Sequence, residues 1–156
     1  MNGEILDLEI DPGLRLIDLL RERLALLGTN SACDTAQCGA CTVIADGLAV
    51  KSCNVLAVQM RGRVILSIEG LSKVGERLHV MQLAFSQHHG LQCGYCTPGF
   101  VMRAVAMARE PVPAEAESVK HALGGNICRC TGYEGIVNAV CEGLTKMRAD
   151  PVQPAS

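Results

Sequence analysis

The sequence predicts an α+β protein, in which a small mixed sheet with one helix (residues 1–72) precedes a helical domain (residues 73–148) and a flexible tail (residues 149–156). Three observations lead to this prediction. Apolar residues alternate with polar ones in the first half, they recur at helical spacing in the second, and eight of the nine cysteines form two sets, one in each half. Domains this small have marginal hydrophobic cores, so a bound metal would stabilise each of them.

The first half begins with a predicted strand and a predicted helix. Residues 6–10 alternate leucine or isoleucine with acidic residues, which is the period of a half-buried strand. After Asp11, Pro12 and Gly13, apolar residues at helical spacing predict a helix that starts near Leu16 and ends near Gly28.

A hairpin and one further strand complete the predicted sheet. Residues 42–45 and 48–53 flank Asp46 and Gly47, a dipeptide that readily adopts the positive φ angles of a tight hairpin turn. Residues 64–68 alternate again and predict another strand.

The second half predicts helices. Thr97 can cap a helix and Pro98 suits its first turn, so we expect a helix from residue 97 to about 109. Further helices are expected over residues 114–123 and 133–148, the former ending at Gly124.

The composition of the sequence limits which partners and which cellular compartment are expected. The formal charge is −2 and no run of Lys and Arg stands out, which argues against nucleic acid as a partner. Residues 78–102 lack charged side chains, but glutamines, histidines and a proline interrupt them, so we expect no transmembrane segment. The N-terminus shows no secretion signal, and a cytoplasmic location is expected. In a reducing compartment, clustered cysteines indicate metal ligands rather than disulfides.

The first cysteine set has the spacing of a plant-type ferredoxin. Cys33, Cys38 and Cys41 lie in one loop and Cys53 follows after the hairpin. Small residues between them allow backbone amides to approach a 2Fe-2S cluster closely, and Gly39 can adopt angles closed to other residues. A structural zinc site is the alternative, although zinc prefers two separated cysteine pairs.

The second set, Cys93, Cys96, Cys128 and Cys130, lies in the helical half. Cys96 precedes the helix that starts at Thr97, whose positive end favours a thiolate. Because these residues form two close pairs, zinc remains an open alternative here. We interpret the ninth, Cys141, as a buried apolar residue.

Neither histidine nor methionine is expected to bind the metal. No histidine stands beside a cysteine at the spacing of a Rieske centre, so we interpret the histidines as surface or capping residues. Met102 and Met107 are expected to pack in a helix core.

Three stretches of sequence carry a close resemblance to a known family. CDTAQCGACTVIADGLAVKSC (residues 33–53), LQCGYCTPG (91–99) and GNICRCTGY (125–133) resemble the small iron-sulfur subunit of molybdenum hydroxylases, the xanthine dehydrogenase and aldehyde oxidase family. Within that family, the three-subunit enzymes of the carbon monoxide dehydrogenase type look nearest. The similarity covers nearly the whole chain.

The resemblance implies a plant-ferredoxin-like β-grasp domain followed by an all-α four-helix domain. It implies that the first cysteine set holds an outer 2Fe-2S cluster near a medium subunit that binds FAD, and that the second set holds an inner 2Fe-2S cluster near molybdopterin on a large subunit. Gln92 and Cys130 would contact the molybdopterin. The expected assembly is a dimer of heterotrimers in which this chain relays electrons and supplies no catalytic residue.

The chain departs from the family pattern at two places. Ala32 replaces the usual glycine before the first ligand, which affects the local turn. Residues 2–3 stand where the family has already formed its first strand, so we expect a segment of roughly eight residues upstream, to pair with residues 6–10.

Two other functions fit the cysteines: a freestanding ferredoxin that carries electrons by diffusion, and a zinc-stabilised adaptor without redox activity. The chain has no G-x-G-x-x-G loop for an organic cofactor. Because the substrate pocket of the resembling enzymes lies on another chain, carbon monoxide, aldehydes, nitrogen heterocycles and aromatic thioesters all remain compatible substrates.

Overall fold

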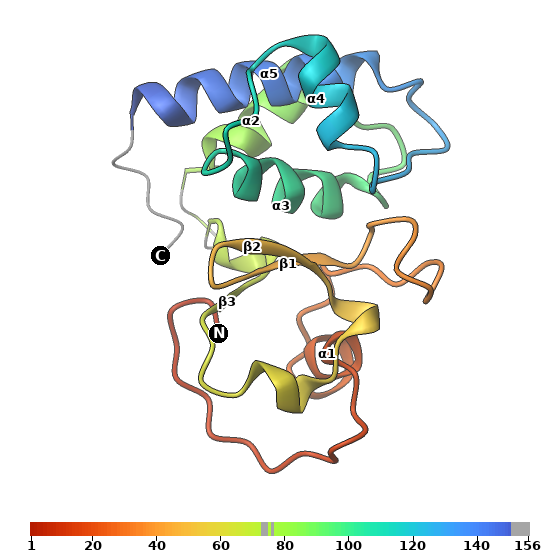
Figure 1. The fold of residues 1–156 in the computed structure, drawn as a ribbon, viewed down its shortest axis with the longest axis vertical. Coiled ribbons are helices and arrows are strands. Elements are labelled where there is room, and N and C mark those ends of the chain that lie inside the picture. Colours follow the sequence, from red (N-terminus) through yellow and green to blue (C-terminus); the bar gives the residue numbers. More distant parts are fainter. Residues whose placement is uncertain (73–74, 76, 151–156) are drawn as a thin grey trace.

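The computed structural model describes residues 1–72, 75 and 77–150. A three-stranded sheet and a short helix form the N-terminal half, and the helices α2 to α5 form the C-terminal half (Figure 1). This arrangement confirms the predicted α+β class. The predicted flexible tail falls largely on residues 151–156, which lie outside the described residues.

The sheet is antiparallel, with strand order β2-β1-β3. Strand β1 (Thr42–Ala45) pairs with β2 (Leu48–Lys51) across the predicted turn, where Asp46 and Gly47 have φ angles of 49° and 84°. The other neighbour, β3, is only Ile65–Leu66 and is shorter than the predicted strand over residues 64–68. It ends there because the backbone N–H of Ser67 turns to the side chain of Asn2 at 2.9 Å.

The predicted strand over residues 6–10 is wrong. These residues have irregular backbone, Ile5 is fully exposed, and Leu6 and Leu8 are also exposed. A strand forms only where a neighbour pairs its backbone groups. Within the described ranges, the edge of β3 instead receives the N–H of Asn2 at the carbonyl of Ile65, at 2.9 Å.

The first helix is shorter than predicted. It consists of one α-helical turn, α1 (Leu16–Asp18), continued by a π-helical segment, Leu19–Arg23, and so ends before Gly28. The left-handed conformation of Ala25, at a φ angle of 54°, breaks the helical path. The helix nevertheless buries Leu16, Leu20 and its other core-facing residues as the apolar spacing predicted.

The described part of the C-terminal half contains the α-helices α2 (Val80–Gln87), α3 (Thr97–Met107), α4 (Ala116–Ala122) and α5 (Glu134–Ala149). The last three confirm the helices predicted from the sequence, with Pro98 in the first turn of α3. None of the helices in these ranges is both long and apolar enough to cross a membrane.

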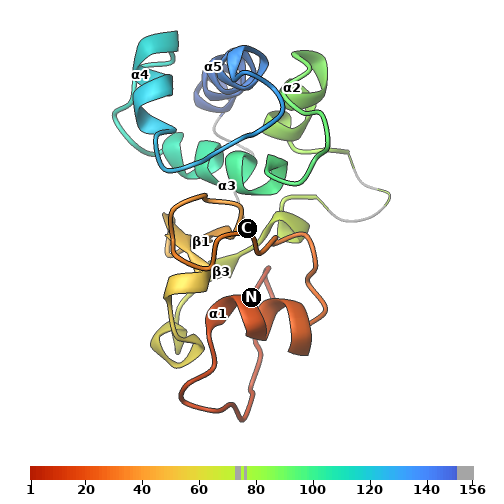
Figure 2. The ribbon, with the colours of Figure 1, turned by 90° about the vertical axis from the view of Figure 1, so that its right-hand side faces the viewer.

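Helix α3 joins the two halves. It lies between the sheet and the other three helices in both ribbon views (Figures 1 and 2). Its buried residues, including Phe100 and Met102, share one core cluster with Ile136 of α5 and with Ile44 and Leu66 of the sheet. The sheet and the helices therefore hold each other in a fixed relation, which places the two cysteine sets side by side.

Candidate metal centres

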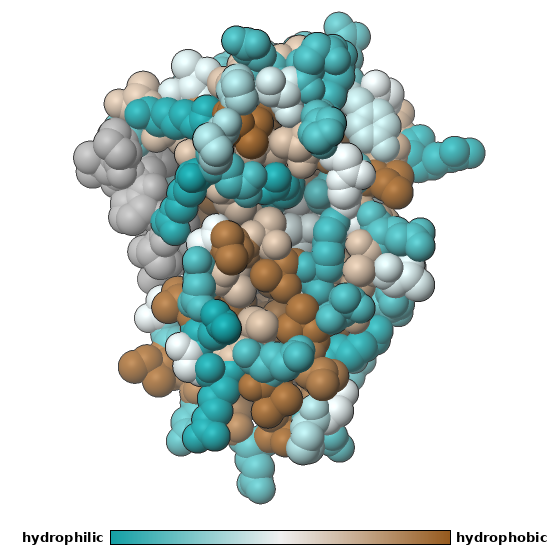
Figure 3. Space-filling view, in the orientation of Figure 1, coloured by the Kyte–Doolittle hydropathy of each residue, from teal (hydrophilic) through white to brown (hydrophobic). Residues whose placement is uncertain are grey.

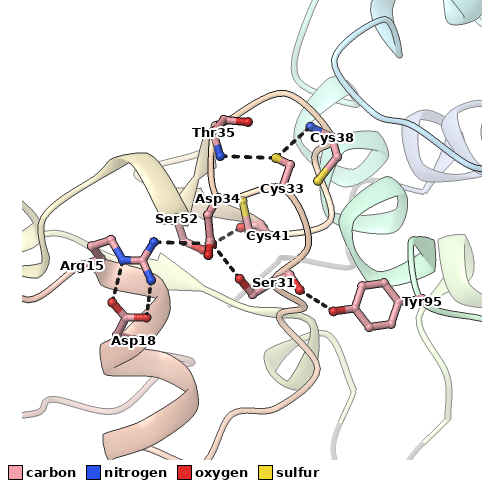
Figure 4. Close-up of polar contacts among 10 residues, drawn as sticks. All are labelled: Arg15, Asp18, Ser31, Cys33, Asp34, Thr35, Cys38, Cys41, Ser52 and Tyr95. Carbon is pink, nitrogen blue, oxygen red and sulfur yellow. Dashed lines mark hydrogen bonds and ion pairs between the residues drawn. The ribbon is translucent and has the colours of Figure 1, made fainter.

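The first cysteine set surrounds the loop that leads into β1. Cys33 and Cys38 are half-buried, whereas Cys41 and Cys53 are buried together with Ile17 of α1. Figure 4 shows the sulfur atoms of Cys33, Cys38 and Cys41 directed toward one space inside the loop. The structure thus brings together the four residues that the sequence grouped.

Local backbone geometry shapes this loop. Asp34, Ala36 and Gly39 have positive φ angles of 53°, 59° and 75°, which coil the chain tightly between the cysteines. After β2, a 3₁₀ turn (Ser52–Asn54) carries Cys53 back to the loop, and the hydroxyl of Ser52 donates to the carbonyl of Cys41 at 2.8 Å. These features make close packing of sulfur and backbone possible.

Backbone amides point at sulfur within the loop. The N–H groups of Thr35 and Cys38 each lie 3.4 Å from Cys33 Sγ, and this hydrogen bonding, above all from Cys38, lowers the pKa of the Cys33 thiol to about 6. Burial, followed by a hydrogen bond with Cys41, raises the pKa of Cys53 to about 11. Amide donors of this kind stabilise negative charge on sulfur, as a metal-bound thiolate requires.

A polar network fixes the outer side of the same loop. Arg15 makes a bidentate ion pair with Asp18 of α1, at 2.7 and 2.9 Å, and its guanidinium also lies 3.4 Å from Asp34 (Figure 4). Ser31 donates to Asp34 at 2.7 Å. The loop is therefore held in place before any metal binds.

The second set lies where two loops of the helical half meet. Cys96 is the residue before α3, and Cys128 and Cys130 lie in the loop between α4 and α5. The sulfur atoms of Cys93 and Cys130 are 3.6 Å apart, and the thiol of Cys96 donates a hydrogen bond to Cys128. Cys128 is buried, whereas Cys93 and Cys130 are exposed. The set therefore has an exposed pair, Cys93 and Cys130, and a less exposed pair, in which Cys96 is half-buried and Cys128 is buried.

In the second set too, hydrogen bonds and burial give the cysteine thiols different pKa values. Cys128 Sγ accepts from the N–H groups of Cys130 and Thr131, both at 3.4 Å, and from the hydroxyl of Thr131 at 3.2 Å. Burial alone would raise the pKa of Cys128, but these donors lower it. Burial raises the pKa of Cys96 to about 12. The hydroxyl of Tyr133 accepts from the N–H of Cys128 at 2.9 Å and fixes the loop.

The two cysteine loops contact each other directly. The N–H of Ile127 donates to the carbonyl of Cys38 at 2.8 Å, and the buried side chain of Asn126 donates to the carbonyl of Gly39 at 3.1 Å. Lys51 donates to the carbonyl of Gly125. We call this contact of residues 38–40 and Lys51 with residues 124–128 the loop seam. It joins residues that lie almost ninety positions apart in the sequence.

The sequence analysis missed three residues of these centres: Lys51, Asn126 and Thr131. Each stands one or two positions from a cysteine, and this proximity was the available signal. Proximity alone could not show that Asn126 and Lys51 reach the opposite loop. Gln92 is exposed beside Cys93, on the surface that also carries Cys130.

The remaining candidates have structural roles. Cys141 is half-buried in α5 and burial raises the pKa of its thiol, in keeping with its interpretation as an apolar residue. His79 caps α2 by accepting from the N–H of Met81 at 3.1 Å, and His88 pairs with Glu142. Met102 and Met107 are fully buried in the core, as expected.

Each set offers four free cysteines, the donor number of a 2Fe-2S cluster, and in the second set the spacing of one pair can be compared with that of metal-bound thiolates. Two thiolates on one tetrahedral metal lie about 3.7 Å apart when the metal-sulfur bonds are about 2.3 Å, and the Cys93 and Cys130 sulfur atoms are 3.6 Å apart. Within residues 1–72, 75 and 77–150, no three Cys, His, Asp or Glu side chains converge as ligands of a single ion. A 2Fe-2S rhomb places its four thiolates around two irons, in pairs.

Two domain families match the chain. Residues 1–64 match the 2Fe-2S iron-sulfur cluster binding domain, and residues 67–141 match the [2Fe-2S] binding domain.

Curated relatives match over nearly the full length. The chain is 45% identical over 145 residues to the 6-hydroxypseudooxynicotine dehydrogenase complex subunit beta of Paenarthrobacter nicotinovorans, covering 92% of this chain and 90% of the relative. It is 42% identical over 144 residues to the xanthine dehydrogenase iron-sulfur-binding subunit of Escherichia coli O157:H7, covering 91% and 89%.

Solved structures have the same fold. Quinoline 2-oxidoreductase from Pseudomonas putida 86 matches with a TM-score of 0.82 and 40% identity, over 90% of this chain and 86% of the matched chain. The aldehyde oxidoreductase of Desulfovibrio gigas matches with a TM-score of 0.89 and 35% identity, over 97% of this chain but 17% of the much longer matched chain.

Proposed function

Because this chain belongs to the family of iron-sulfur subunits of xanthine dehydrogenases and aldehyde oxidoreductases, we propose that it relays electrons from molybdopterin on a large subunit, through two 2Fe-2S clusters, to FAD on a medium subunit. The loop seam is the observation that carries this proposal. The loop of Cys38 and the loop of Cys128 share the hydrogen bond from Ile127 to Cys38, so two clusters bound there would be close neighbours.

We assign the ligands as the sequence grouped them. Cys33, Cys38, Cys41 and Cys53 hold the outer cluster, and Cys93, Cys96, Cys128 and Cys130 hold the inner one. When bound, each cluster accepts and releases one electron at a time. The close pairs support one refinement for the inner cluster: Cys93 and Cys130 bind one iron, and Cys96 and Cys128 bind the other.

Membership of this family also suggests the detailed fold of each domain. We assign residues 1–72 to a β-grasp domain of the plant-ferredoxin type and residues 73–148 to a four-helix cluster-binding domain. The shared core of α3 with the sheet supports a rigid relation between the two domains, and therefore a constant spacing between the clusters. The finer similarity to the carbon monoxide dehydrogenase type stays a prediction.

The exposed pair of cysteines gives the relay a direction. Cys93 and Cys130 reach the surface beside the exposed Gln92, so the inner cluster is the one that the molybdopterin can approach. We therefore assign Gln92 and Cys130 as the molybdopterin contacts and the inner cluster as the first electron acceptor. The outer cluster then delivers electrons to the FAD.

The chain would work within a cytoplasmic dimer of heterotrimers. Apolar residues gather on the N-terminal half of the face in Figure 3, and Leu48, Leu56, Val58 and Val64 of that half are exposed. Exposed apolar surface of this kind commonly marks a protein interface. Similar relatives are named for nicotine, caffeine, xanthine and aldehydes, so we expect the large subunit to select the substrate.

Metal and sulfide analysis tests the proposal. The chain, isolated anaerobically with its partner subunits, should contain about four irons and four acid-labile sulfides per polypeptide, and reduction should produce two distinct paramagnetic signals. A colourless, zinc-loaded chain would contradict the proposal, and so would a solitary 16.5 kDa protein that exchanges electrons by diffusion.

A further inference from the structure

Lys51 is a cation that the fold places in the loop seam. It is the last residue of β2, where it pairs with Thr42, the residue after Cys41, and it lies two residues before Cys53. Its half-buried side chain extends away from the strand, and Nζ donates to the carbonyl of Gly125 on the opposite loop. This hydrogen bond holds the ammonium group at one position between the two cysteine loops.

The ammonium group lies close to Gly125. A methyl group at residue 125 would lie 3.4 Å from Nζ, which is ordinary van der Waals contact, so the side chain of Lys51 packs directly over the glycine backbone. The loop of residues 124–128 therefore accepts a hydrogen bond from Lys51 and contacts its side chain at Gly125.

The charges that surround Lys51 are the cysteines of the first set. Burial lowers the pKa of Lys51, and negative charge on Cys41, Cys38, Cys33 and Cys53 would oppose that effect, in this order of strength. None of the ion pairs found within the described ranges involves Lys51. In the part of the chain that the structure describes, no carboxylate therefore forms an ion pair with this ammonium group.

We propose that Lys51 tunes the outer cluster: its positive charge, held in the loop seam, stabilises the reduced form and so draws electrons from the inner cluster. This inference rests on the proposed function. The reduced cluster carries one more negative charge than the oxidised one, and net charge near a cluster is one of the factors that set its potential. A single electron moves onto the outer cluster, and no bond forms or breaks at Lys51.

Redox titration of the whole complex tests this role through an equilibrium rather than through activity. Lys51→Gln removes the charge but keeps a hydrogen-bond donor, Lys51→Met removes both, and Lys51→Arg keeps the charge. The outer cluster is identified as the one whose paramagnetic signal changes in Cys38→Ser. Lys120→Gln, which removes an exposed lysine of α4 paired with Glu117, is the control for loss of one positive charge elsewhere.

In the glutamine and methionine variants, we expect the ratio of oxidised to reduced outer cluster at a fixed potential to rise about tenfold. This corresponds to a reduction potential lower by about 59 mV for one electron. The arginine variant and the control should stay close to the unaltered complex, and the inner cluster should shift less than the outer one. If Lys51→Gln fails to load its clusters, Lys51→Met gives the same comparison with arginine.

Three results would overturn the proposal: an unchanged outer potential in both neutral variants, a shift in the methionine variant alone, which would indicate a purely structural hydrogen bond, or an equal shift of both clusters. Each of these leaves the proposed function intact because both signals are present. Absence of the two signals from the unaltered complex would instead remove the proposed function together with this inference.

Discussion

Replacing Gly99 with alanine should disrupt a close approach between helix α3 and the loop that carries the first cysteine set. Gly99 is buried in the first turn of α3, and a Cβ atom there would lie 2.1 Å from the carbonyl oxygen of Gly39 and 3.0 Å from Cα of Ala40. Ordinary contact begins at 3.4 Å, so the backbones would have to separate by more than an ångström at their nearest point.

Two opposing effects determine how much Gly99→Ala changes the free energy of unfolding. Overpacking that moves backbone costs about 1 to 3 kcal/mol or more, and the better helix propensity of alanine returns at most about 1 kcal/mol. Because the obstructing atoms belong to backbone rather than to a flexible side chain, we expect the cost to dominate. A net loss of about 2 kcal/mol corresponds to a fall in Tm of about 4 to 8 °C for a chain of this size.

Gly143→Ala provides a matched control in α5. Its Cβ would meet the side-chain end of Met81, at 2.5 Å from both Sδ and Cε, and that end can move. We expect its Tm to stay within a few degrees of the original, as helix propensity offsets the repacking. Thermal unfolding of the unaltered protein and of the two variants, followed by circular dichroism, measures the difference in Tm. Equal Tm values for Gly99→Ala and Gly143→Ala would refute the reasoning.

Three further predictions concern the seam, an ion pair and the ligands. Asn126→Ala should lower the free energy of unfolding by about 1 to 2 kcal/mol because it removes the buried hydrogen bond to the carbonyl of Gly39. Asn126→Asp should lower it further because a carboxylate would face that carbonyl. Urea unfolding measures both variants, and equal values would contradict the assigned hydrogen bond. The Arg103 guanidinium holds the pKa of Glu110 below its ordinary value of 4.5. The ion pair therefore stabilises the fold above about pH 4.5, by at most about 1 kcal/mol. This stabilisation is lost as the pH falls through the lowered pKa. Stability measured against pH should therefore fall less steeply in acid for Glu110→Gln, and identical curves would count against the pair. Cys53→Ser should remove about half of the bound iron while Cys141→Ser retains all of it, and iron analysis that shows a loss in Cys141→Ser would invalidate our ligand assignment.

Local sequence signals predicted the local structure well. Asp46 and Gly47 form the expected turn because the positive φ angles of that turn depend on those two residues alone. Helix α3 likewise starts where predicted, with Pro98 in its first turn, but the prediction that Thr97 caps it is wrong, because the N-cap is Cys96, whose side chain makes no capping hydrogen bond. The prediction for residues 6–10 failed because alternation describes which side of a strand is apolar, whereas a strand also needs a neighbour to pair with.

The early end of the first helix has a similar cause. Apolar spacing continued to Leu27, but Leu27 is 58% exposed and the helix ends at Arg23. Spacing cannot show how far the core extends along a helix. Packing of the sheet against Leu16 and Leu20 decides that, and beyond Leu24 the chain must turn toward the first cysteine.

By itself, the sequence determined the two cysteine sets, because each loop's spacing depends on chain geometry over a few residues, and it determined the hairpin and the three helices α3 to α5. Only the tertiary structure decided how the two loops meet. Asn126 reaches Gly39, Lys51 reaches Gly125, and Cys93 lies beside Cys130 because α3 packs against both the sheet and the other helices. Such contacts depend on the packing of the whole core, and no local pattern of residues encodes them.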